Sequence, residues 1–113
     1  MNLSPQAMER LAQQQQKYLA SLPAKRERIL SCWQGIQVNG WGCECFLDLK
    51  TEVHRLAGSA GSYGLAKLGM AAKDLDTLLA SELEITVNST NIVDLMDHLF
   101  FELDNAVNQF ATI

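Results

Sequence analysis

One of the two histidines in the chain, His54, lies among apolar residues that recur at helical spacing. Those apolar residues are Phe46, Leu49, Val53, Leu56 and Ala60. Successive residues of an α-helix are rotated by about 100°, which puts His54 about 120° from the centre of the apolar stripe. We therefore expect the imidazole to project toward solvent from a helix whose other face is buried. A neutral imidazole keeps a ring nitrogen lone pair and can act as a covalent nucleophile.

The residues that follow His54 on the same side of this helix have almost no side chain. They are Ala57, Gly58 and Gly61, which lie three, four and seven positions onward. Glycine inside a helix costs about 0.5–1 kcal/mol relative to alanine. Close packing against the next helix would account for one of the two glycines. A gap that admits an approaching protein would account for both glycines and for Ala57. The pattern therefore favours a docking face beside an accessible imidazole.

The segment from His54 to Leu65, HRLAGSAGSYGL, resembles the signature around the phosphorylated histidine of histidine-containing phosphotransfer (HPt) domains. The histidine, the two helical glycines and Gly64 of the following turn stand at the offsets of that motif. The resemblance continues in the next predicted helix through Leu68, Ala72 and Leu75. Outside residues 50–80 it depends on the helical pattern alone.

The resemblance implies phosphorelay chemistry. His54 is expected to accept a phosphoryl group on Nε2 from the aspartyl phosphate of a receiver domain in a hybrid histidine kinase. It then passes the group to the receiver of a response regulator. Such a domain brings no cofactor, and the Mg²⁺ ion belongs to the partner receiver. The sequence has no phosphate-binding glycine loop or nucleophile elbow, so we expect a stoichiometric carrier and not an enzyme.

The resemblance also suggests supporting residues. Gly58 and Gly61 keep the imidazole accessible, and Gly64 forms the turn. Asp76 stands where relatives commonly place a Gln or Glu that hydrogen-bonds the histidine, and there it would orient Nδ1–H. The alternative is a solvated carboxylate paired with Lys73, one turn earlier.

One position departs from the family pattern. Many HPt domains have lysine three residues after the histidine, where this chain has Ala57. Lys50, one turn before His54, and Lys67, at the start of the next helix, are the candidates to balance phosphate charge instead. Without such a cation, a second hypothesis is an HPt-like module that docks a receiver or kinase and is not phosphorylated.

The elements that must position this site are predicted to be helical almost throughout. Ser4-Pro5 predicts an N-cap, and a break or kink at Pro23 is expected to separate a first helix, to about Ser21, from a second, to about Gln37. Further helices are predicted at 43–62, 65–80 and from Asn91 to 110, with Asn91 and Asp94 spaced like a capping box. This pattern favours an all-α fold: an antiparallel up-and-down four-helix bundle with an additional N-terminal helix, as one domain over residues 1–113.

Composition limits the other functions. A net charge of −4 and a pI near 5.0 disfavour binding to nucleic acid or an anionic membrane. No stretch approaches the roughly 20 apolar residues of a membrane-spanning helix. The three cysteines, Cys32, Cys43 and Cys45, are expected to be buried or half-buried thiols and not a metal or redox site. We expect a cytoplasmic monomer.

The second histidine, His98, offers a weaker candidate. With Asp94 it forms an i, i+4 pair of the kind that can bind a metal ion. No matching pair occurs on another predicted helix, however, and the Glu-x-x-His pairs of di-iron bundles are absent. We interpret His98 as a surface residue.

Overall fold

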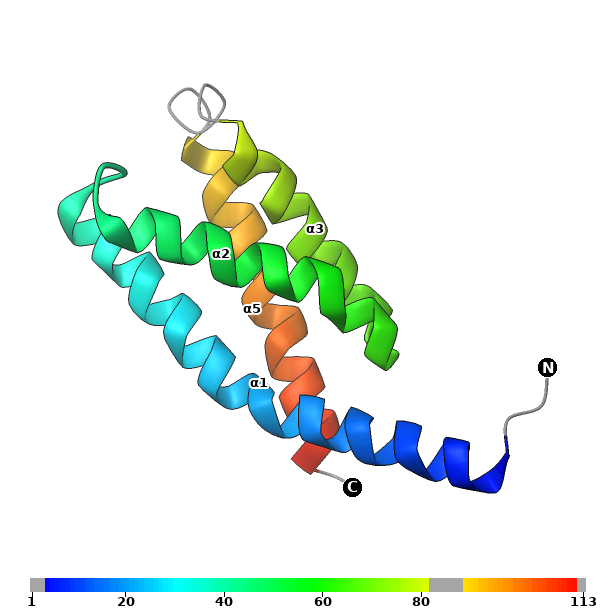
Figure 1. Cartoon of the computed structure of the whole chain (residues 1–113). Helices are drawn as coiled ribbons and strands as arrows, with labels where there is room; N and C mark the ends of the chain where they lie inside the picture. The colour runs from blue at the N-terminus through cyan, green and yellow to red at the C-terminus, as the bar shows by residue number, and fades with distance from the viewer. Residues whose placement is uncertain (1–3, 82–88, 112–113) are drawn as a thin grey trace.

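The computed structural model describes residues 4–81 and 89–111, and within these ranges the chain is all-α (Figure 1). No strand occurs in the described residues, which confirms that the fold is all-α as predicted. The molecule measures 51 × 27 × 21 Å. Its elements are α1 (Pro5–Asn39), α2 (Glu44–Ser59), the 3-10 helix η1 (Ala60–Tyr63), α3 (Ala66–Ala80) and α5 (Ser89–Ala111).

Helix α1 begins as predicted but does not break. The Ser4 hydroxyl caps it by accepting a hydrogen bond from the Ala7 N–H at 3.1 Å, and Pro5 occupies its first turn. Of the break or kink predicted at Pro23, the break into two helices is wrong, because one helix continues to Asn39. An internal proline costs about 3 kcal/mol, but Leu22 and Ile29 on either side of it are fully buried in the same core. Their burial holds both halves in place, and Figure 1 shows the helix axis changing direction along its length.

The first part of α1 extends past the other helices (Figure 1, blue). Every side chain from Met8 to Lys17 is exposed, and burial begins at Tyr18 and Leu19. From there on, α1 packs against α2 and α5, and α3 packs against the same two helices. The four helices therefore enclose one apolar core. Its fully buried large side chains are Leu22, Ile29, Leu49, Val53, Leu56, Leu68, Leu75, Leu79, Ile92, Met96, Leu99 and Leu103.

The turn between α2 and α3 is tighter than predicted. The α-helical part of this segment ends at Ser59, and residues to Tyr63 form η1. Gly64 follows with φ of 82°, a left-handed conformation that glycine adopts without strain. The N–H of Leu65 donates to the carbonyl of Ala60 at 3.0 Å, which closes the turn.

Helix α3 approaches this turn closely at Gly69. A Cβ atom built on Gly69 would lie 3.2 Å from the backbone nitrogen of Gly61, so the missing side chain lets the two backbones meet. Helix α5 has already begun at Ser89, and the N-cap predicted at Asn91 therefore falls inside the helix. Among the described helices, none is long and apolar enough to cross a membrane.

Candidate functional site

His54 lies on the solvent-facing side of α2, as the helical wheel predicts. Its side chain is 78% exposed, whereas its neighbours Val53 and Leu56 are almost fully buried. Burial of this apolar stripe fixes the rotation of α2, and this rotation keeps the imidazole outside the core.

One ring nitrogen of His54 has a defined partner. Nδ1 lies 3.1 Å from Oδ2 of Asp76 on α3. An ionised carboxylate can only accept a hydrogen bond, so Nδ1 carries the proton and donates. In the neutral ring Nε2 then keeps its lone pair, and no described residue forms a hydrogen bond with it. The pair thus selects one tautomer and leaves the outer nitrogen available as a nucleophile or base.

The alternative pairing of Asp76 with Lys73 does not occur. Of the ion pairs within the described residues, the one that includes Asp76 is formed with His54. Asp76 is 30% exposed, so it is partly screened by α2 and α3 while it contacts the imidazole. The structure therefore brings together the two residues that the motif had suggested as partners.

A shallow hollow surrounds the imidazole at this place. It is lined by Lys50, Thr51, His54, Arg55, Asp76 and Ala80. Lys50 is thus a neighbour of His54, although its ammonium lies 5.3 Å from the centre of the Phe46 ring. The ammonium is attracted to the electron-rich face of that ring.

Lys67, the other predicted cation, does not line the hollow that contains His54. Lys67 lies nine residues before Asp76 on α3, which at 1.5 Å per residue is about 13 Å along the helix axis. It lines a different cavity, next to α5. Of the two predicted cations, the structure therefore brings only Lys50 to the hollow that contains His54.

The two glycines beside His54 are open to solvent. A Cβ atom built on Gly58 or Gly61 has no neighbouring atom within 4 Å. Packing against α3 therefore explains neither residue, and the glycine that packing does require is Gly69. The surface beside the imidazole is left without side-chain cover, and an approaching molecule can reach the ring from that side.

A contact with α1 that the sequence did not reveal holds the end of α2. The Tyr18 hydroxyl lies 2.7 Å from the Ser59 hydroxyl, and its ring stacks on Tyr63 with 4.3 Å between centroids. The Gln15 amide donates to the carbonyl of Tyr63 at 2.8 Å. Burial raises the pKa of Tyr18, and the hydrogen bond with Ser59 opposes that rise. These residues fix η1 to α1, and only their helical spacing was visible in the sequence.

The remaining candidates lie apart from this site. His98 and Asp94 are exposed on α5, and the described residues contain no group of three side chains able to hold a metal ion. Cys32, Cys43 and Cys45 are half-buried free thiols, as predicted. Burial raises the pKa of Cys32, and a hydrogen bond with Cys43 raises that of Cys45. Cys32 and Cys45 therefore form less of the nucleophilic thiolate at neutral pH than ordinary cysteines do.

Comparison with known proteins adds no relative. No family model, no curated protein and no solved structure matches this chain.

Proposed function

We propose that this chain is a phosphorelay intermediate in which His54 carries the phosphoryl group. The group comes from the receiver domain of a hybrid histidine kinase and passes to the receiver domain of a response regulator. One observation supports this most directly: an imidazole that is 78% exposed has Nδ1 bonded to Asp76, while Nε2 faces solvent. The open backbone at Gly58 and Gly61 adds room for a partner.

In the proposed reaction, the Nε2 lone pair attacks the phosphorus atom of the partner's aspartyl phosphate. The N–P bond forms as the acyl O–P bond breaks, and the partner's aspartate leaves as a carboxylate. Nδ1–H continues to donate to Asp76, which stabilises the positive charge that develops on the ring. Transfer to the second receiver reverses these steps. The Mg²⁺ ion that neutralises phosphate charge belongs to the receiver.

The fold that accompanies this proposal is the antiparallel up-and-down four-helix bundle of HPt domains. Consecutive helices α1, α2, α3 and α5 contact one another, and α5 contacts α1 again, as expected for a closed bundle. The N-terminal part of α1 takes the place of the separate additional helix. We propose that residues 1–113 act as one domain, as a monomer in the cytoplasm.

A transfer experiment tests the function. The full chain is incubated with a receiver domain that has been labelled with ³²P on its aspartate. We expect label on the wild type and none on His54→Gln. His98→Gln is the matched control, because it removes the other exposed imidazole and should take up label normally. Equal labelling of His54→Gln and wild type would falsify the site.

The alternative function is docking without phosphorylation, and Ala57 favours it. The position that is lysine in many HPt domains is here a half-buried alanine, and the cations that line the hollow are Lys50 and Arg55. If this alternative holds, wild type and His54→Gln bind a receiver domain with equal affinity, and neither acquires an acid-labile phosphate. Label on wild type excludes it.

A further inference from the structure

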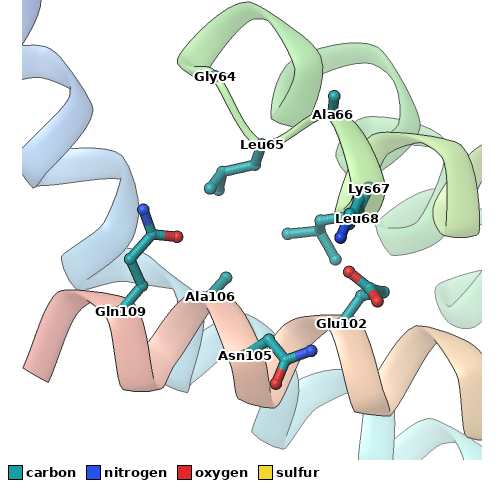
Figure 2. Close-up of a pocket in the computed structure, with 9 residues that line it drawn as sticks. All are labelled: Gly64, Leu65, Ala66, Lys67, Leu68, Glu102, Asn105, Ala106 and Gln109. Atoms are coloured by element: carbon teal, nitrogen blue, oxygen red, sulfur yellow. The ribbon is translucent and has the colours of Figure 1, made fainter.

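A second cavity, remote from His54, lies between the start of α3 and the C-terminal half of α5 (Figure 2). Its volume is about 430 Å³, within the range of small-molecule sites. One wall comes from the Gly64 turn and the first residues of α3, and the other from Glu102, Asn105, Ala106 and Gln109 of α5. The two walls differ in charge.

The α3 wall is positive. The backbone hydrogen bonds around the start of α3 are donated by Leu65 and by Gly69, which leaves the N–H groups of Ala66, Lys67 and Leu68 without a backbone acceptor. The N-cap residue, Leu65, supplies no side-chain acceptor either. Three free N–H groups at the start of a 15-residue helix attract an anion. All three residues line the cavity, and the Lys67 ammonium adds a full positive charge.

The α5 wall is negative. Glu102 is 8% exposed and is the one charged residue that is buried among the described side chains. It forms no ion pair with any described residue, Lys67 included. Its carboxylate oxygens keep some contact with solvent, because no fully buried side-chain oxygen of the described residues lacks a partner. Figure 2 shows its carboxylate directed across the cavity toward the start of α3. A carboxylate that keeps only limited contact with water is stabilised when it gains a hydrogen-bonding or cationic partner.

We propose that this cavity binds a small zwitterion with one carboxylate and one ammonium group, such as a free amino acid. The ligand carboxylate accepts hydrogen bonds from the N–H groups that begin α3 and pairs with Lys67. The ligand ammonium pairs with Glu102. Leu65 and Ala106 also line the cavity, and they contact the carbon atoms of the bound ligand.

The charge pattern excludes simpler ligands. A plain anion would meet the Glu102 carboxylate, and a plain cation would meet Lys67 and the positive end of α3. A molecule that carries both charges satisfies both walls at once. This site shares no residue with the hollow at His54, so the proposal is independent of phosphotransfer.

Isothermal titration calorimetry on the full chain tests the proposal. The probes are the common α-amino acids, together with β-alanine and γ-aminobutyrate, which separate the two charges further. Each probe that binds is repeated as its amide, which lacks the carboxylate, and as its N-acetyl derivative, which lacks the ammonium. We expect at least one zwitterion to bind, and each blocked derivative to bind about tenfold more weakly or not at all.

Variants on both walls keep the test decisive. Glu102→Gln and Lys67→Met should each weaken binding by about tenfold. Asp97→Asn, an exposed acid on the same helix, should bind like wild type. Circular dichroism establishes that each variant is folded. If the buried substitution Glu102→Gln unfolds the chain, Lys67→Met alone tests the site, because Lys67 is exposed. The proposal is overturned if no zwitterion binds at millimolar concentration, or if blocked derivatives bind equally well.

Discussion

The Nδ1 atom of His54 and the Oδ2 atom of Asp76 lie 3.1 Å apart, although 22 residues separate them in the chain. The contact joins α2 to α3 at the surface and decides which ring nitrogen faces solvent. A polar partner of this kind fixes the orientation and the tautomer of a reactive imidazole.

Loss of the Asp76 carboxylate should slow phosphotransfer. We expect Asp76→Ala to lower the transfer rate from a phosphorylated receiver by about tenfold, because the ring can then rotate and adopt the other tautomer. Asp76→Asn keeps an amide oxygen that can accept from Nδ1–H, and its loss should be smaller. Rapid-quench kinetics measure both rates. Asp74→Ala removes an exposed carboxylate two positions earlier and should transfer at the wild-type rate. A normal rate in Asp76→Ala would exclude the positioning role.

Two substitutions of Gly58 should have separate effects, one on the stability of the fold and the other on docking of a receiver domain. Gly58→Ala is expected to raise the free energy of unfolding by about 0.5–1 kcal/mol, because its Cβ meets no atom within 4 Å. Urea denaturation measures this change. Gly58→Gln should slow transfer from a receiver but leave labelling by phosphoramidate, a small donor, unchanged. If both donors slow equally, the substitution has altered His54 itself and not the access of a protein partner.

Substitution of Gly69 by alanine should lower the free energy of unfolding, which Gly58→Ala is expected to raise. Gly69→Ala places a Cβ atom 3.2 Å from the backbone nitrogen of Gly61, and backbone cannot move aside as a flexible side chain can. We expect a loss of about 1–2 kcal/mol in the free energy of unfolding, after the gain in helix propensity. The same denaturation experiment compares it with Gly58→Ala. Stabilisation of both variants would show that α3 shifts away from η1 without cost.

Tyr18 should ionise at a higher pH than an ordinary tyrosine. Burial raises the pKa of Tyr18 above its ordinary value of 10.0. Tyr63→Phe leaves Tyr18 as the remaining tyrosine, so absorbance of tyrosinate against pH should give a midpoint above that value. The folded state favours the neutral phenol, and the stabilisation is therefore complete below about pH 10 and is lost as pH rises through the folded pKa. A midpoint at or below 10.0 would contradict the burial of this phenol.

Local patterns predicted most of the helices. The apolar stripe of α2 correctly placed Val53 and Leu56 inside and His54 outside, because the helical period alone determines these directions. Pro23 shows where local rules fail. Its intrinsic cost predicts a helix break, but the burial of Leu22 and Ile29 outweighs that cost, and such burial depends on the rest of the fold.

Contacts between distant residues were less predictable. Asp76 was suggested by its place in a motif, and the structure shows its contact with His54. The contact between Tyr18 and Ser59 spans 41 residues, and no sequence motif predicts it. In the sequence, Glu102 likewise cannot be distinguished from the exposed acidic residues of the same amphipathic helix. Its burial opposite the start of α3 follows from how α3 and α5 pack, which sequence periodicity does not specify.

Although α1 is one continuous helix, its two ends should differ in how readily the backbone hydrogen bonds open. Isolated helical segments are marginally stable in water, and the side chains from Met8 to Lys17 add little burial. Beyond Leu19 the same helix belongs to the core. Its amide hydrogens should therefore exchange with deuterium in two regimes. Those before Tyr18 exchange through fraying of the end, and those from Leu22 to Ile36 exchange only when the whole fold opens.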